Sequence, residues 1–559
     1  MKVRMQKCLK SEKKKIREFS LNEILLVIFL FTVFTIWFTY PLILVMNDSV
    51  HDEGDSVANL WLLTRNMNKL LYDRGEFFYS DDVFYPEGFY LASGEMYITE
   101  TLMGLPVYLL TSNPIFTYNF ILIVSFVLSG LGMYILTKFY TKNSFSAFLS
   151  AFIFTFCSYK SAHLFQLQLL SLQWLPFTVF YFHKMLSEKK LKYAVLSAVF
   201  FSLQALSSVY YAVFTGIFLI FYFLFMIKEK RKIKLSHLII FTPLSLVLIM
   251  PFYIHYLLCY KSHSIEEIRS SHILDYFLPG DINEFYIRLG FERGNLGERN
   301  IFIGIVALSL SLLGLIFVKK RLVKFYALIG LLFLVLSLGP KPNFSSFTNF
   351  LYYLPPFSSL RVPTRFSIMV MFSVSILAGF GLHNLSFKMR NRKVQFLTLV
   401  LITVLLIFEY WGTFTYLHLE NIEVYNWLSK EEGDFAIIEL PNVDMYNAMY
   451  LFYSLIHKKK LYFGITTFYP KRSLDISITK EQIPELLLRI RNESNLILYK
   501  QFTHTFKDGA TLNSYVYKFV DMNSTTINLF NTRDFAYLII HQGNFPKKQS
   551  VYTLSFLFG

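Results

Sequence analysis

Long runs of apolar residues alternate with short polar segments along the first three quarters of the chain. A helix that crosses the hydrocarbon core of a bilayer needs about 20 mostly apolar residues. Most of the runs carry no charge at their centre, as expected where a central charge costs about 2.5–3.5 kcal/mol on insertion scales. The pattern predicts about eleven membrane helices, at 21–46, 114–137, 144–160, 169–183, 191–208, 210–227, 236–258, 300–318, 324–338, 365–384 and 394–412.

The basic residues between these runs predict the orientation of the chain. If the amino terminus is inside, the inner segments hold 27 Lys and Arg, whereas the longer outer loops between the helices hold 12. Cytoplasmic loops carry the excess of basic residues in membrane proteins, so this orientation is favoured. The segment 1–20 is then a basic cytoplasmic leader, and the 21–46 run is too long for the core of a signal peptide. Eleven spans place 413–559 on the outer side.

Composition excludes an ordinary soluble protein. The chain is 54% hydrophobic and 16% charged, against about 25% charged residues in soluble domains. Its net charge of +16 does not predict a nucleic-acid partner, because the basic residues form short clusters between apolar runs instead of one basic face. Three scattered cysteines provide neither a disulfide framework nor a metal motif.

The region after the last apolar run has a different pattern. Strand-like runs at 435–440, 461–465 and 535–540 alternate with helical stretches such as 480–499. This alternation is typical of a small α/β domain. We therefore predict a mainly α protein, with a polytopic transmembrane helical bundle over 21–412 and an extracytoplasmic α/β domain over 413–559.

The first outer loop, 47–113, contains eleven acidic and three basic residues. Its early part can begin a helix with acids at the favourable amino end, which places Asp55 and Asn59 on one face. Asp55 is then the candidate general base, and Asp52, Glu53 and Asn59 are candidate substrate contacts. Asp52 and Asp55 are the candidate ligands if a divalent cation is bound. Helix capping and the ordinary acidity of an outer loop are the alternative explanation.

One further candidate lies later in this loop, and another lies at the same predicted depth outside it. The turn at 84–88 places Glu87 between aromatic residues, as a substrate contact or as part of a plain turn. Gln204, Tyr210 and Tyr211 interrupt an apolar stretch where the chain must turn outside. They form either one wall of a substrate cavity or a polar hairpin.

Basic side chains complete the set of candidates at the outer rim. His163 lies in the short outer turn predicted between the third and fourth spans, where it either faces a cavity or is a satisfied interfacial histidine. Arg361 and Arg365 precede the tenth span. Arginine suits bidentate phosphate binding, although it also anchors helices at the membrane interface.

Several short strings occur in an order that resembles polytopic GT-C-type glycosyltransferase-like membrane proteins of prokaryotes. Each string is weak alone, and together they extend over most of the chain. They are GDSVANLW (54–61), FYPEG (84–88), YN (118–119), LSGLGM (128–133), AFIF (151–154), QWLP (173–176), LQALSS (203–208), RVPTRF (361–366) and ELP (439–441).

The resemblance implies sugar transfer from a polyprenyl-phosphate-linked donor to a glycan, lipid or protein acceptor at the outer face of the cytoplasmic membrane. It implies an essential acid in the first outer loop, which maps most directly onto Asp55. Arg361 and Arg365 are then expected at the donor phosphate, with the lipid tail between the spans. The alternatives are a transporter or flippase for lipid-linked sugars or polymers, and an assembly subunit. A transporter typically shows repeated halves and ionisable groups near the midplane, and this sequence shows no such repeat.

Overall fold

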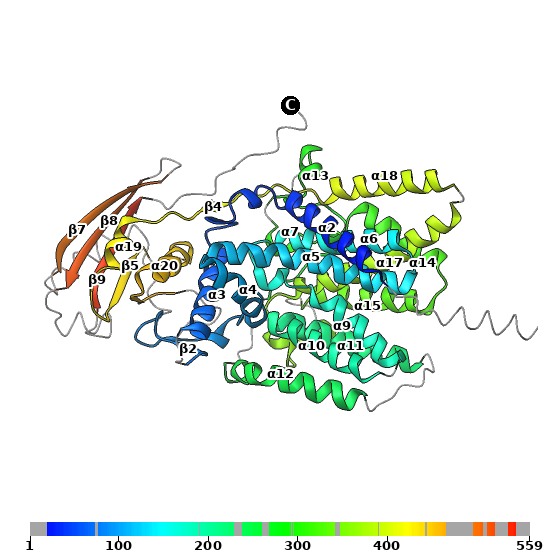
Figure 1. The fold of residues 1–559 in the computed structure, drawn as a ribbon, viewed down its shortest axis with the longest axis horizontal. Helices are drawn as coiled ribbons and strands as arrows, with labels where there is room; N and C mark the ends of the chain where they lie inside the picture. Colours follow the sequence, from blue (N-terminus) through cyan, green and yellow to red (C-terminus); the bar gives the residue numbers. More distant parts are fainter. Residues whose placement is uncertain are drawn as a thin grey trace, which may run out of the picture.

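The computed structural model describes residues 19–72, 76–188, 190–228, 237–259, 268–291, 293–294, 296–340, 347–389, 391–441, 444–464, 496–506, 511–519 and 535–543. Most of these residues are helical, and a five-stranded sheet lies at the opposite end of the molecule from the helical bundle (Figure 1). The basic leader 1–20 falls almost wholly outside the described residues. The predicted mainly helical fold with a sheet near the carboxyl end is confirmed.

Every one of the predicted apolar runs contains a helix. Six of the described helices are long and apolar enough to cross a membrane, namely α2, α5, α11, α12, α17 with the turn before it, and α18. The remaining five are shorter, at 13 to 17 residues. The helices are α2 (Leu21–Phe38), α5 (Pro114–Thr141), α6 (Ser144–Phe156), α9 (Trp174–Glu188), α10 (Leu191–Ser207), α11 (Val209–Lys228), α12 (Leu238–Leu258), α14 (Ile305–Phe317), α15 (Arg321–Ser337), α17 (Ser367–Lys388) and α18 (Arg392–Tyr410).

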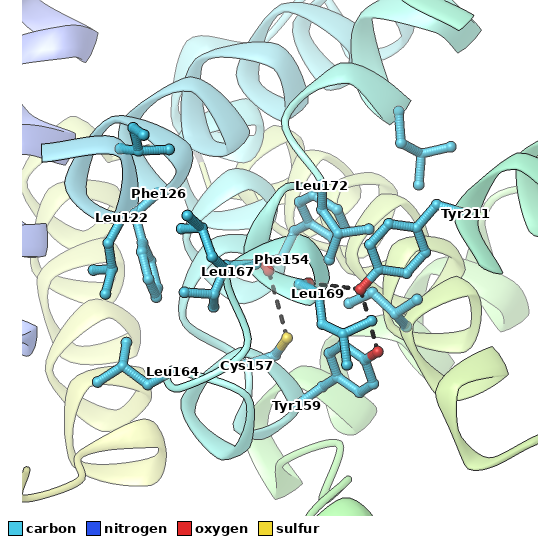
Figure 2. Packing of buried hydrophobic residues seen from close by; sticks show 14 of the residues in the cluster. Leu122, Phe126, Phe154, Cys157, Tyr159, Leu164, Leu167, Leu169, Leu172 and Tyr211 are labelled. Atoms are coloured by element: carbon cyan, nitrogen blue, oxygen red, sulfur yellow. Dashed lines mark hydrogen bonds between the residues drawn. The ribbon is translucent and has the colours of Figure 1, made fainter. Parts of the chain in front are cut away.

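The segment predicted as a short outer turn between α6 and α9 contacts two other predicted outer segments, through Gln166 to Asp55 and through His163 to Glu298. The chain there forms two short helices, α7 (Ser158–Ala162) and α8 (Leu167–Leu170), and almost all of its residues are buried. Figure 2 shows Leu164, Leu167 and Leu169 packed among apolar side chains of the bundle. Its leucines pack in the core of the bundle, and His163 is fully buried with its ring against acceptor oxygens.

Close helix packing in the bundle depends on small residues. Nearly every side chain of α17 is buried, and its closest neighbour is α14. A Cβ atom built on Gly381 lies 1.9 Å from the carbonyl oxygen of Leu310, and one on Gly314 lies 2.3 Å from that of Leu377. The two backbones approach to a distance that only glycine permits, as is common between membrane helices.

The acidic outer loop is largely structured. It contains α3 (Asp55–Leu71), a hairpin of β2 (Tyr79–Ser80) and β3 (Phe89–Tyr90), and α4 (Ile98–Thr111). The helix predicted at its start is confirmed, whereas α4 is a second, apolar helix that the charge pattern of the loop conceals. Exposed leucines on α4 are Leu102, Leu109 and Leu110.

The carboxyl-terminal domain contains a mixed sheet with strand order β6-β5-β9-β8-β7. The strands are β5 (Ala436–Leu440), β6 (Lys460–Leu461), β7 (Leu496–Thr505), β8 (Thr511–Phe519) and β9 (Phe535–Gly543), accompanied by α19 (Glu423–Leu428) and α20 (Asp444–His457). Three of these strands are the predicted ones. Of the predicted helix 480–499, residues 480–495 lie outside the described part, and the end is wrong because β7 pairs with β8. Strand pairing there overrides local propensity.

This domain docks on the acidic outer loop. The indole Nε1 of Trp61 on α3 donates to Ser454 Oγ on α20 over 3.1 Å. Backbone bonds join Leu461 N to Asp82 O (2.8 Å) and Tyr85 N to Leu461 O (3.0 Å). In addition, β1 (Ser49–Val50) pairs with β4 (Leu417–His418). The loop and the domain thus form one layer, with α3 between the sheet and the bundle (Figure 1).

Candidate functional site

The start of α3 is held by its own acids and by the buried segment between α6 and α9. Asp52 Oδ1 accepts hydrogen bonds from Gly54 N (3.1 Å) and Ser56 N (2.8 Å), which satisfies amides that a helix start leaves unpaired. Asp55 is exposed, and its Oδ2 accepts from Gln166 Nε2 over 2.8 Å. Asn59 Nδ2 donates to Phe165 O over 3.1 Å. Asp55 and Asn59 therefore share a face, as predicted, and that face contacts 165–166.

The same segment leads to a buried charge cluster. His163 Nε2 lies 2.8 Å from Glu298 Oε2, and its Nδ1 lies 2.6 Å from the carbonyl oxygen of Tyr159. Glu298, in η6 (Gly297–Arg299), also accepts hydrogen bonds from both Nε and Nη2 of Arg365, which lies in η8 (Pro363–Phe366). Both ring nitrogens of His163 therefore lie within hydrogen-bonding distance of an oxygen atom.

The charges around Glu298 determine its ionisation. Burial by itself raises the pKa of this carboxyl, but the positive charges of Arg365 and His163 and their hydrogen bonds lower it by more. The net pKa of Glu298 is well below the usual range. The carboxylate therefore stays ionised between its two basic neighbours.

The two predicted tyrosines, Tyr210 and Tyr211, make different contacts. The Arg365 guanidinium carbon lies 4.7 Å from the centroid of the Tyr210 ring, and the Tyr210 hydroxyl accepts from Val362 N over 3.3 Å. Tyr211 is buried, with its hydroxyl donating to Leu169 O over 2.6 Å and lying 3.2 Å from the Tyr159 hydroxyl (Figure 2). Tyr210 thus belongs to the charge cluster, whereas Tyr211 secures the buried segment.

Three other predicted residues lie away from Asp55 or serve other contacts. Gln204 is fully buried, and its Nε2 donates to Ser171 O over 2.7 Å. Glu53 is half-buried just before α3. Glu87 lies in the turn of the hairpin that docks on the carboxyl-terminal domain, where its carbonyl oxygen accepts from Tyr79. The structure therefore does not bring Glu87 to the Asp55 face.

Arg361 differs from Arg365. Its carbonyl oxygen accepts from Arg269 N over 2.8 Å, which fixes the backbone beside the charge cluster. Its half-buried guanidinium makes no hydrogen bond or ion pair with any residue of the described part of the chain. Arg365 is already bound to Glu298, so Arg361 is the arginine of the predicted pair that can take an anionic ligand.

Two acids of the region have no distinguishing local pattern. Glu298 is one of several acids in its loop, and only the folding of that loop over the bundle brings it to Arg365. Glu95 accepts from Ser208 Oγ (2.8 Å) and Val209 N (3.2 Å) at the start of α11. Burial raises the pKa of Glu95, which these hydrogen bonds and the charge of Arg365 only partly offset. Neither acid follows from sequence spacing.

The residues near Asp55 can be tested for a divalent cation. Among the described residues, no group of three or more His, Cys, Asp and Glu side chains is arranged to hold a metal ion. Asp52 already caps α3, which leaves Asp55 as the exposed carboxylate. Mg²⁺ is often held by one or two carboxylates together with water and substrate phosphate. Asp55, with Asp52 behind it, fits such a site only if the donor phosphate supplies further ligands.

Comparison with known proteins identifies the family. Residues 102–417, more than half of the chain, match the family described as 6-pyruvoyl-tetrahydropterin synthase related domain, membrane protein. The chain belongs to this family of membrane proteins. The match begins in α4 and ends in β4, so it contains every helix of the bundle from α5 to α18 but not α2. No curated protein matches the chain.

The solved structures that are similar to this chain include the following two. One is the archaeal oligosaccharyltransferase AglB from Archaeoglobus fulgidus, in complex with an inhibitory peptide and a dolichol-phosphate (14% identity, 79% of this chain and 64% of that chain, TM-score 0.42). The other is ArnT from Cupriavidus metallidurans bound to undecaprenyl phosphate. It is 9% identical, the likeness covers 86% of this chain and 97% of that chain, and the TM-score is 0.45. Both are GT-C glycosyltransferases, the class that the sequence strings resemble. With TM-scores below one half, the likeness does not establish an activity for this chain, which spans under two thirds of AglB.

Proposed function

We propose that this membrane protein is a glycosyltransferase that moves a sugar from a polyprenyl-phosphate-linked donor to a glycan, lipid or protein acceptor. The observation that carries the proposal is the exposed carboxylate of Asp55, held at the start of α3 by Gln166 and linked through residues 163–166 to the charge cluster. The proposed location is the outer face of the cytoplasmic membrane, with the amino terminus inside and the carboxyl-terminal domain outside. The distribution of Lys and Arg supports this orientation.

Asp55 is the proposed general base. Gln166 binds Oδ2, and Oδ1 has no partner among the described residues, so this oxygen can accept the proton of an acceptor hydroxyl. The hydroxyl oxygen then bonds to the anomeric carbon as the bond from that carbon to the phosphate oxygen breaks. Attack from the face opposite the leaving phosphate inverts the anomeric centre. General-base assistance of this kind typically contributes about 10²–10⁴ in rate.

Arg361 is the proposed partner of the leaving phosphate. Negative charge grows on that phosphate as the glycosidic bond breaks, and a fixed guanidinium stabilises it. The cluster of Glu298, His163 and Arg365 holds the segment that carries Arg361 in place. A divalent cation bound to Asp55 and the donor phosphate would add further charge neutralisation.

The test is transfer by purified protein in lipid nanodiscs, supplied with radiolabelled polyprenyl-phosphate sugar and a cell-envelope extract. We expect labelled glycoconjugate from the wild-type chain and nearly none from Asp55→Asn. Gln501→Ala, on an exposed position of β7, is the control that should leave transfer unchanged. Movement of the intact labelled donor across the membrane without any glycoconjugate contradicts the proposal and supports a transporter.

A further inference from the structure

Glu100 is a fully buried acid that the proposed reaction does not use. It lies in the first turn of α4, within the outer loop, and its relative exposure is 0%. Neither carboxylate oxygen makes a well-formed hydrogen bond. No Lys, Arg or His of the described residues forms an ion pair with it. A buried carboxylate in this state is costly, because buried charges in proteins are normally paired or bound to a metal ion.

Side chains on segments that contact α4 carry buried oxygen atoms without a hydrogen-bond partner among the described residues. The hydroxyl of Ser171 approaches Glu100, and its oxygen has no well-formed hydrogen bond. Gln204 donates from Nε2 to Ser171 O, which leaves its Oε1 buried and unpaired. Gln173 directs Nε2 to the sulfur of Met103, one turn after Glu100 on α4, and its Oε1 is also buried and unpaired.

The orientation of the Gln204 amide follows from its partner. Ser171 O is an acceptor only, so the amide nitrogen must face it and the amide oxygen must face away. The helices around the site are tied together, because Thr99 Oγ1 on α4 donates to Leu203 O on α10 over 2.8 Å. Glu100, one residue after Thr99, is therefore held against the part of α10 that carries Gln204.

This set of atoms has the chemistry of a hard-cation site. Its donors are all oxygens, which suit alkali and alkaline-earth ions and not the softer metals that prefer nitrogen or sulfur. It holds a single carboxylate, so one positive charge neutralises it, whereas a divalent ion leaves a net charge inside the protein. We propose that Glu100, Ser171, Gln173 and Gln204 form an internal binding site for an alkali cation, Na⁺ or K⁺.

Protons compete with the cation for Glu100. The pKa of this carboxyl is raised to about 8, because burial and, to a smaller extent, the charge of Glu95 raise it by more than hydrogen bonds with Ser171, Ser207 and the backbone amide lower it. Tyr97 and Tyr256 are the other titratable groups whose charge couples to Glu100. Below pH 8 the apparent cation affinity should fall about tenfold per pH unit, because each bound cation displaces one proton.

The bound cation would contact side chains from α4, from residues 171–173 and from α10, and so would link these three segments. These elements carry or adjoin Glu95, Ser208 and the buried segment that positions Gln166. The site would therefore contribute to stability, and it is independent of the proposed sugar transfer.

The test uses the purified full-length protein at pH 9 and constant ionic strength, in choline chloride, NaCl or KCl. Thermal unfolding and binding of ²²Na⁺ or ⁸⁶Rb⁺ are the two measurements. We expect a saturable rise in Tm with Na⁺ or K⁺ and binding of about one ion per chain, both lost in Glu100→Gln. Glu76→Gln, an exposed acid of the same loop, should behave like the wild-type chain.

Two further observations keep the proposal open to refutation. In choline chloride, Glu100→Gln should unfold at a higher temperature than the wild-type chain, since it removes an uncompensated buried charge. If Glu100→Gln does not fold, the wild-type comparison among the three salts still decides the matter. Equal Tm values in all three salts, together with no ion binding at pH 9, overturn the proposal and leave Glu100 as a protonated acid.

Discussion

Glu298 accepts hydrogen bonds from both Nε and Nη2 of Arg365, so the loop between α12 and α14 is clamped to the start of α17. His163 contacts the same carboxylate from the segment between α6 and α9. One acid thus joins three parts of the chain that are far apart in the sequence. We therefore expect Glu298 to stabilise the contacts among these three segments.

Removing the charge of Glu298 should be strongly destabilising. Glu298→Gln leaves Arg365 buried without its counter-charge, and breaking one partner of a buried pair typically costs about 3–5 kcal/mol. Thermal unfolding in detergent measures the loss. The matched control is Glu284→Gln, which breaks the exposed pair of Glu284 and Arg288 in the same loop and should cost well under about 1 kcal/mol. Equal losses in the two variants would show that the clamp is unimportant.

The clamp also predicts a dependence of stability on pH. The pKa of Glu298 is lower in the folded chain than in the unfolded one, whose Glu side chains titrate near about 4.3. Its stabilising contribution is therefore fully present above that value and is lost as the pH falls toward the folded pKa. Between about pH 5 and pH 3, the Tm of the wild-type chain should fall more steeply than that of Glu298→Gln. Parallel curves for the two proteins contradict this reading.

A second clamp in the same loop should respond in the same direction. Asp275 accepts from Arg293 (2.9 Å) and from Nε and Nη2 of Arg299 (2.8 and 2.9 Å). Burial raises the pKa of Asp275, but these arginines and the amide of His272 lower it by more. Arg299→Gln should lower Tm at pH 7, and the difference from the wild-type chain should shrink as the pH falls below about 4. A difference that is constant with pH would assign Arg299 a packing role only.

Gln166 is predicted to be a positioning residue for the proposed base. Gln166→Ala removes the hydrogen bond to Asp55 Oδ2 and leaves the carboxylate in place. Misplaced catalytic groups cost up to about 100-fold in rate, so kcat for transfer should fall while KM for the lipid donor stays the same. The sugar-transfer assay in nanodiscs separates the two constants. An unchanged kcat would remove Gln166 from the positioning of Asp55.

Glycine packing in the bundle provides a prediction that does not depend on function. Gly381→Ala places a Cβ 1.9 Å from Leu310 O, so α14 and α17 must separate, at a cost of about 1–3 kcal/mol or more. Gly216→Ala on α11 meets nothing within 4 Å and should be neutral or stabilising by up to about 1 kcal/mol. Unfolding of both variants in the same detergent compares the two positions. A neutral Gly381→Ala would show that these helices are not in close contact.

Patterns in the sequence predict the helices and strands more successfully than they predict the tertiary contacts between them. Apolar runs of about the length of a membrane-spanning helix appear directly in the sequence. Each of the eleven contains a helix. The shared face of Asp55 and Asn59 follows from helical spacing alone. By contrast, the sequence does not show that His163, between α6 and α9, is fully buried, because its burial depends on what packs over it.

The charge cluster shows the same limit. Arg365 stands out in the sequence because it lies at the outer end of a span, but its partner Glu298 does not. That pairing arises from a loop folded across the bundle, and a distance of 67 residues along the chain leaves no local trace. Predicting such contacts requires the tertiary arrangement itself.

Helix α3 contacts both the helical bundle and the carboxyl-terminal domain. Asp55 at its start contacts Gln166 of the bundle, while Trp61 contacts Ser454 of the carboxyl-terminal domain. Six residues of helix separate them, which is about 9 Å along a rigid axis. The proposed base and the contact with the carboxyl-terminal domain therefore share one rigid helix, so a change in the direction of that helix would displace both together.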